Sequence, residues 1–250
     1  MTNLPVPFFF LSLLVFWLAG RFGGYLRIKH PLKDEARDDF AIVQAATLTL
    51  LGLIIGFSFS MAVSRYDQRK NYEEAEANAI GTEYVRADIL PADSAAAVRS
   101  ELAKYIDLRI RYYQTRESRL RRQIDADTTQ LQAQMWTTVV APAAAHPTPV
   151  IALVVSGMND VLNSQGYTQA AWWNRIPTSA WGLLMAIAIC GNILVGYSAR
   201  TGKSKDVLHF VLPLVIAITF LLIADIDSPR GGLIHVTPRN LISLSKSISR

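Results

Sequence analysis

Four long stretches of the sequence contain no Asp, Glu, Lys or Arg: Met1–Gly20, Phe40–Ser64, Ile176–Ala199 and Val207–Ala224. Each is close to the roughly 17–25 residues that an α-helix needs to cross a bilayer. A helix of a soluble protein presents one face to water, so it rarely stays uncharged over this length. We therefore predict four membrane-spanning helices and a multi-pass protein of the cell (inner) membrane.

The first stretch has a second interpretation, as a cleaved secretory signal peptide. Its N-terminus lacks the positive charge of such peptides, its apolar run Leu4–Leu18 is long, and Arg21 follows soon after. These features favour a retained membrane helix.

Residues 65–175, between the second and third stretches, are polar and rich in helix formers. No proline interrupts Phe40–Leu90, so the second membrane helix is predicted to continue out of the bilayer for about 50 residues in all, or about 75 Å. Pro91 ends it. The next helix is predicted from Asp93 to Val140, because its apolar residues recur at spacings of three and four.

A proline-punctuated linker follows over residues 141–149, and a third polar helix, Val150–Trp173, returns the chain to the membrane. The predicted fold is all-α: four transmembrane helices with a membrane-proximal helical bundle inserted between spans 2 and 3. The predicted parts are transmembrane helices 1 and 2 (1–64), a projecting polar helical domain (65–175), transmembrane helices 3 and 4 (176–227) and a C-terminal tail (228–250).

The formal net charge of +5 raises the question of a nucleic-acid partner. In a membrane protein, excess Lys and Arg serve loops and lipid headgroups, so we predict the lipid bilayer as the partner and no nucleic acid. None of the histidines has a second ligand at metal-binding spacing; they are His30, His146, His209 and His235. We predict no enzyme, no metal site and no cofactor.

Small residues recur at every fourth position of the second span: Gly52, Gly56, Ser60 and Ser64. Such a ridge lets another helix approach closely. It predicts either tight packing between spans of one subunit or packing between copies of this helix around an axis.

The neighbouring face of the same span carries Thr49, Leu53 and Phe57, also at a spacing of four. Contributed by several subunits, this face would form a narrow ring that gates ions by dewetting. These three residues are the pore-neck candidates. The alternative is that they face lipid.

Charged residues flank the spans. Arg65 and Arg69 lie one helical turn apart, and Glu73 follows Arg69 by four residues. This spacing predicts either a ladder of salt bridges or a site that attracts anions to a pore mouth.

Asp225 and Asp227 end the fourth span, where the helix dipole disfavours negative charge. We expect them to have a partner. The candidates are the arginines Arg65, Arg175 and Arg230, with a divalent cation as the alternative.

Four crossings place both termini and the 65–175 domain on one side. The short loops on the opposite side hold an excess of Lys and Arg, which favours a cytoplasmic location for these loops. Arg65, Arg69 and Lys70, beside the second span, argue for the reverse. The charge rule leaves the side open.

The second span and its exit resemble the pore helix of bestrophins, on Gly56-Phe57, Arg65-Tyr66 and Asn71. The chain also resembles, over nearly its whole length, bacterial proteins with a bestrophin-like domain. The segments that carry this resemblance are Gly56–Ala62, Glu76–Thr82 and Asp227–Gly231. Bestrophins are pentameric anion channels with four spans per subunit, a cytosolic helical domain and cytosolic termini.

The resemblance implies that Leu53 and Phe57 face a pore neck. Thr49 departs from the pattern, since bestrophins have an apolar residue there. The acidic run that binds calcium in the animal channels is absent after Gly231, so calcium gating is not implied. We predict a homo-oligomeric pore for small anions, a pentamer if it follows bestrophins. The alternative is a non-conducting scaffold or sensor whose projecting domain binds a partner.

Overall fold

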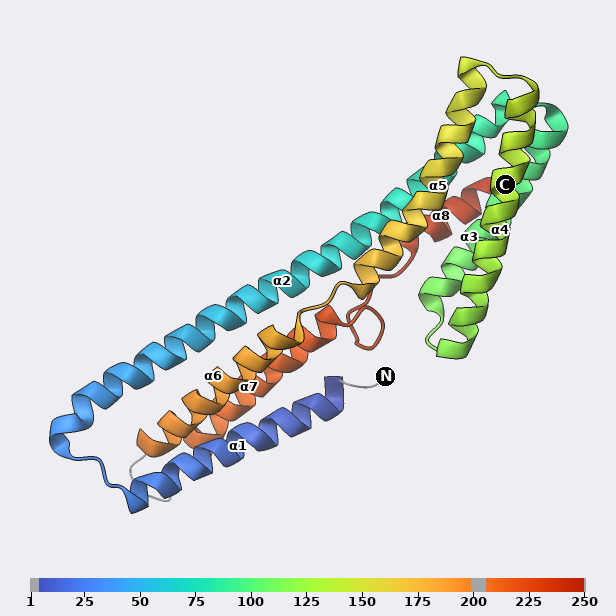
Figure 1. The fold of residues 1–250 in the computed structure, drawn as a ribbon. Helices are drawn as coiled ribbons and strands as arrows, with labels where there is room; N and C mark the ends of the chain where they lie inside the picture. The colour runs from blue at the N-terminus through green and yellow to red at the C-terminus, as the bar shows by residue number, and fades with distance from the viewer. Residues whose placement is uncertain (1–4, 199–205, 250) are drawn as a thin grey trace. The chain divides into compact units, whose positions relative to one another are not determined.

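A computed structural model describes residues 5–198 and 206–249, and these residues form helices without a strand (Figure 1). The α-helices are α1 (Pro5–Lys29), α2 (Arg37–Arg86), α3 (Ala92–Gln114), α4 (Ser118–Ala145), α5 (Pro149–Trp173), α6 (Thr178–Ser198), α7 (Asp206–Asp227) and α8 (Arg239–Ile248). Short 3-10 helices, Asp34–Ala36 and Ala87–Ile89, flank α2.

Within the described ranges, four helical segments are long and apolar enough to cross a membrane. They lie within Val6–Lys29, Asp34–Ile89, Pro149–Ser198 and Phe210–Asp227. The predicted all-α fold with four spans is confirmed. The prediction that α2 runs without a break past the apolar stretch is also confirmed, because α2 has 50 residues.

The chain forms two compact units, and α2 contributes to both. The first unit comprises Met1–Arg65 and Arg175–His235; the second comprises Tyr66–Asn174 and Val236–Arg250.

In the first unit, α1 packs lengthwise against α6 and α7 (Figure 1). The backbones of α1 and α6 meet directly, since a Cβ atom on Gly196 would lie 1.9 Å from the carbonyl oxygen of Gly20. Gly23 is equally enclosed, because its Cβ would lie 2.0 Å from the carbonyl oxygen of Ile193. Small residues permit this close approach. Close packing matters inside a membrane, because the hydrophobic effect does not drive helices together there. The rings of Phe16 and Phe220 meet edge to face at 5.4 Å on the α7 side.

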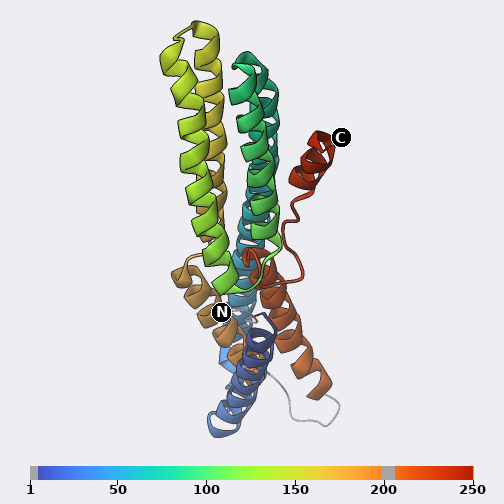
Figure 2. The ribbon, with the colours of Figure 1, turned by 90° about the vertical axis from the view of Figure 1, so that its right-hand side faces the viewer.

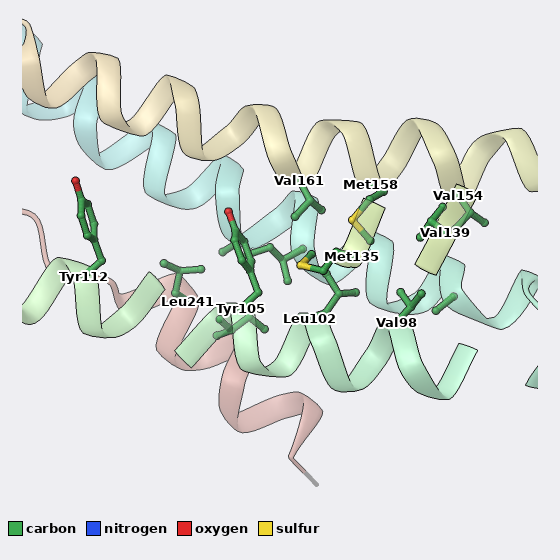
Figure 3. Packing of buried hydrophobic residues seen from close by; sticks show 14 of the residues in the cluster. Val98, Leu102, Tyr105, Tyr112, Met135, Val139, Val154, Met158, Val161 and Leu241 are labelled. Atoms are coloured by element: carbon green, nitrogen blue, oxygen red, sulfur yellow. The ribbon is translucent and has the colours of Figure 1, made fainter. Parts of the chain in front are cut away.

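In the second unit, α4 packs against both α3 and α5, as Figure 2 shows, and α8 packs against α3. Each helix turns one apolar face inward, and Figure 3 shows how these faces interdigitate. The core includes Val98, Leu102 and Tyr105 of α3, Met135 and Val139 of α4, Val154, Met158 and Val161 of α5, and Leu241 of α8.

The single helix predicted over Asp93–Val140 is wrong, because the chain turns at residues 115–117 between α3 and α4. This break lies in a polar run, Gln114–Arg119, which no apolar residue interrupts. Without an apolar side chain to bury there, the chain reverses and α4 packs back on α3. The predicted linker over 141–149 is also too long, because α4 continues through Pro142 to Ala145.

Candidate functional site

The membrane stretch of α2 is the least enclosed of the four spans. In its most apolar 18-residue stretch, only 6% is buried within the chain, against 22–44% in the corresponding stretches of the other three spans. Thr49 is exposed, and so are Leu53 at 53% and Phe57 at 63%. The three pore-neck candidates therefore share a face of α2 that the chain itself leaves uncovered.

The small-residue ridge of α2 is also uncovered. A Cβ atom built on Gly52 or Gly56 meets nothing within 4 Å in the described part of the chain, and Ser60 and Ser64 are exposed. No described residue of the chain thus packs on Gly52 or Gly56, and the role of this ridge stays a prediction. Leu51 is buried instead, and it lies beside Gly191 of α6. Contact with the rest of the unit thus uses a different face of α2.

Asp227, at the end of α7, joins three parts of the first unit. Both of its carboxylate oxygens accept a hydrogen bond from the backbone N–H of Ile176 at 3.1 Å, just before α6. Its Oδ1 also lies 3.6 Å from Nη1 of Arg65, at the end of the membrane part of α2. Both side chains are largely buried. Arg65, one of the three arginines expected near the acidic pair, therefore lies within salt-bridge distance of Asp227.

Asp225 is held by backbone amides. Its two carboxylate oxygens accept hydrogen bonds from the N–H groups of Leu233 at 2.9 Å and Ile234 at 2.8 Å. Gly232 allows the chain to pass this close to the carboxylate, because a Cβ there would lie 2.2 Å from Oδ1 of Asp225. The carboxylate therefore fixes the turn that follows α7.

The four arginine candidates do not share one role. Arg69 is buried in the second unit, where its guanidinium donates to the carbonyl oxygens of Ala171 at 3.3 Å and Asn174 at 3.4 Å. These carbonyls end α5, where a positive charge is favourable. In the first unit, Arg175 is exposed and Arg230 is half-buried.

Glu73 caps the C-terminal helix α8. Its Oε1 accepts from the backbone N–H groups of Asn240 and Leu241, each at 3.0 Å, and its Oε2 accepts from the Asn240 side chain at 2.7 Å. Glu73 thus has a role beyond the ladder predicted with Arg69, because its carboxylate serves the N-terminus of α8.

Two further acids of α2, which were not among the predicted site residues, are buried in the second unit. Glu76 pairs with Arg109 of α3, and both side chains are almost fully enclosed. The hydroxyl groups of Tyr113 and Thr168 donate to Oε2 of Glu76 at 3.4 Å and 3.3 Å. Burial and the negative charge of Glu76 both raise the pKa of Tyr113, which keeps this phenol a donor.

Glu83, two turns further along α2, is fully buried, and neither carboxyl oxygen has a hydrogen-bond partner among the residues that the structure describes. It lies against α5, because a Cβ on Gly157 would be 2.0 Å from its Oε2. Burial raises the pKa of Glu83 from 4.5 to about 8; Asp160 adds to the rise and Arg86 opposes it. The signal for both acids was their spacing along α2, since 76 and 83 fall on one helix face, two turns apart.

Among the side chains that the structure describes, which exclude that of His209, no group of three or more His, Cys, Asp or Glu residues could hold a metal ion. The carboxylates of Asp225 and Asp227 are instead engaged by backbone amides and Arg65.

Comparison with known proteins gives a family for this chain. No curated protein sequence matches it. Two crystal structures of a bacterial bestrophin homologue from Klebsiella pneumoniae are similar in fold. One has a TM-score of 0.65 at 14% identity and covers 96% of this chain and 98% of its own. The other, a point variant, has a TM-score of 0.66 at 12% identity and covers 99% and 100%.

A crystal structure described as that of a membrane protein has a TM-score of 0.63 at 15% identity and covers 98% and 97% of the two chains. At these identities the likeness shows a shared fold. The family model for the bestrophin-like domain matches residues 7–241, which is most of the sequence. The chain therefore belongs to the bestrophin-like family.

Proposed function

We propose that this chain assembles with copies of itself into a pore of the inner membrane that conducts small anions. Membership of the bestrophin-like family supports a pore, and the uncovered membrane face of α2 supports assembly. The choice of anions rests on the family alone. This is the role of a channel, not of an enzyme.

The observation that carries the proposal is the pairing of two uncovered faces on α2. The ridge of Gly52 and Gly56 has open space above it, into which a helix of a second copy can pack. The adjacent face, with Leu53 and Phe57 exposed, would then turn to the axis of the assembly. Thr49 would lie one turn along from Leu53. Five copies would follow the bestrophin pattern.

Arg65 and Arg69 contribute less to anion attraction under this proposal. Arg65 pairs with Asp227, and Arg69 is committed to the end of α5. Both are better described as residues that hold the structure beyond the spans. Residues 65–175 form the domain that would project from the membrane, on the cytoplasmic side if the chain follows bestrophins.

The experiment is an anion-flux assay on the purified chain in liposomes, with Leu53→Ala and Leu183→Ala as a matched pair. Both leucines are 53% exposed, on α2 and on α6. Truncation at a pore neck widens every subunit's contribution at once, and dewetting depends steeply on radius. We expect Leu53→Ala and Phe57→Ala to raise flux without loss of the oligomer, and Leu183→Ala to leave it unchanged.

Equal behaviour of Leu53→Ala and Leu183→Ala would mean that both residues face lipid, and the pore neck would be wrong. Absence of flux for the unmodified chain across several ions and voltages would favour the alternative, a non-conducting scaffold or sensor whose 65–175 domain binds a partner.

A cysteine at Ser118, probed in intact cells with an impermeant thiol reagent, reports the side of the membrane on which the 65–175 domain lies. Labelling there would place the domain outside the cell.

A further inference from the structure

One end of the second unit is fixed near the bilayer by the chain itself. The chain passes between this unit and the first at three points, and Tyr66, Asn174 and Val236 are the residues of the second unit at these points. The apolar stretch of α2 ends at Ser64 and the next begins at Ile176. A chain spans at most about 3.6 Å per residue, so the bundle end that carries Tyr66 and Asn174 lies within a few residues of the hydrocarbon core.

The turn between α3 and α4 lies at this same end of the bundle. Trp172, near the end of α5, stacks on Tyr112 with ring centroids 5.2 Å apart and meets Tyr113 edge-on at 5.0 Å. Both tyrosines belong to the last turn of α3, which ends at Gln114. Figure 2 shows the α3–α4 turn at the end of α4 opposite to the α4–α5 turn. A helix of 28 residues separates the two turns, which is about 42 Å.

The two turns differ sharply in charge. Five arginines and two acids lie between positions 111 and 125; the arginines are Arg111, Arg116, Arg119, Arg121 and Arg122, and the acids are Glu117 and Asp125. Arg116, Arg119 and Arg122 are exposed. The α4–α5 turn, residues 146–148, and the last residues of α4 before it, 141–145, have no Asp, Glu, Lys or Arg. Of the two turns, the excess of positive charge therefore lies at the α3–α4 turn.

Apolar side chains accompany these arginines. Leu120, between Arg119 and Arg121, is 36% exposed, and Trp173, the last residue of α5, is 74% exposed. Tryptophan gathers at the headgroup level of membranes, where its ring is partly wet and partly apolar. Guanidinium groups bind phosphate oxygens through paired, charge-assisted hydrogen bonds. Exposed arginines with an exposed leucine among them and a tryptophan at the end of α5 fit a lipid surface better than a soluble ligand.

We propose that the α3–α4 turn, with Arg116, Arg119, Leu120 and Arg122 at its surface, binds anionic phospholipid headgroups of the leaflet from which the bundle emerges. The turn then holds the bundle against the membrane as a second attachment beside the chain connections. This inference does not depend on the pore, because a non-conducting scaffold would need the same attachment.

The experiment uses the full chain in nanodiscs, with Cys190 replaced by Ala and a nitroxide label on Leu120→Cys. A label on Ala145→Cys, exposed at the opposite end of α4, is the matched control. Collision with oxygen reports the bilayer, and collision with a water-soluble nickel complex reports the aqueous phase. In discs with phosphatidylglycerol at low salt, we expect the label at 120 to gain oxygen contact and lose nickel contact. The label at 145 should stay aqueous.

Molar salt and the triple variant Arg116→Gln, Arg119→Gln, Arg122→Gln should each abolish this shift, because each arginine near an anionic surface strengthens binding about fivefold. The corresponding triple Lys variant should retain it. Equal signals in neutral and anionic discs would overturn the proposal. So would protection of the label at 120 in lipid-free detergent, which would indicate a second copy, or protection there only on addition of heparin, which would indicate a soluble polyanion.

Discussion

Asp227 clamps the backbone N–H of Ile176 between its two carboxylate oxygens, each at 3.1 Å. The same carboxylate lies 3.6 Å from Arg65, so one side chain ties the end of α7 to the start of α6 and to α2. We expect Asp227→Asn to lower the free energy of unfolding by about 1.5–3 kcal/mol, since hydrogen bonds to a charged group are of this size.

Thermal unfolding of the purified chain in detergent measures this effect. Asp38→Asn is the matched control, because Asp38 is exposed at the start of α2 and its loss should cost only about 0.3–1 kcal/mol, the dipole contribution. Equal melting temperatures for the two variants would show that the clamp contributes nothing beyond ordinary surface charge.

Gly232 leaves room for the carboxylate of Asp225, and any side chain there must displace it. A Cβ would lie 2.2 Å from Oδ1, so Gly232→Ala forces Asp225 away from the N–H groups of Leu233 and Ile234. We expect a loss of about 1–3 kcal/mol, as for other overpacked sites. Gly182→Ala on α6 should be tolerated, because nothing described lies within 4 Å of its Cβ. A wild-type melting temperature for Gly232→Ala would contradict the geometry of the turn.

The features that the sequence predicts well are those that depend on one segment at a time. Four charge-free stretches predict four spans, and the absence of proline predicts the length of α2. The break at residues 115–117 escaped prediction, because no Pro or Gly marks it and only the lack of apolar residues over Gln114–Arg119 does. The cost of leaving a helix face without packing partners is a tertiary effect that local propensity does not report.

Partners of the charged residues could be predicted only in part. The sequence shows that Asp225 and Asp227 need partners at a helix C-terminus, and it offers Arg65 among the candidates. It cannot show that Asp225 is satisfied by backbone amides eight and nine residues ahead, because every residue has such an amide. Arg109 lies 33 residues from Glu76, and nothing in the sequence distinguishes it from a surface arginine. Only the folding of α3 onto α2 brings the two side chains together.

The buried pair of Glu76 and Arg109 predicts a non-additive response to substitution. Arg109→Met alone should cost about 3–5 kcal/mol, because it strands a buried carboxylate. Adding Glu76→Gln removes that charge and keeps an acceptor for Tyr113 and Thr168, so the double variant should be more stable than Arg109→Met. Denaturant unfolding of both variants tests this, and a double variant less stable than the single one would be inconsistent with a charge-based cost.

Glu73 should hold α8 in place. Its carboxylate accepts three hydrogen bonds from Asn240 and Leu241, so Glu73→Ala leaves the N-terminus of α8 uncapped, at a cost of about 1–2 kcal/mol. We expect faster amide hydrogen exchange over Arg239–Ile248 in this variant. Glu74→Ala is the matched control, because Glu74 is the exposed neighbour on the same helix. Unchanged exchange in Glu73→Ala would mean that the apolar contacts of Leu241 alone anchor α8.

Glu83 makes the stability of the second unit depend on pH. Burial raises its pKa from 4.5 to about 8 in the folded chain, so between these values the folded state holds a proton that the unfolded state has released. The folded state therefore loses stability as pH rises through this window, by up to about 1.4 kcal/mol per pH unit, and the loss ends above pH 8. Below pH 4.5 the carboxyl group is protonated in both states and contributes no pH dependence.

The charged groups that act on Glu83 are Arg86 on its own helix and Asp160 on α5. Glu83→Gln, which keeps the shape beside Gly157 and cannot ionise, should flatten the fall in melting temperature between pH 5 and 8. Asp160→Asn removes a charge that raises the pKa of Glu83, so the fall should end at a lower pH in this variant. Melting curves of the full chain in detergent across this range measure both effects, with Glu74→Gln as the exposed control. A fall that persists unchanged in Glu83→Gln would assign the pH dependence to another group.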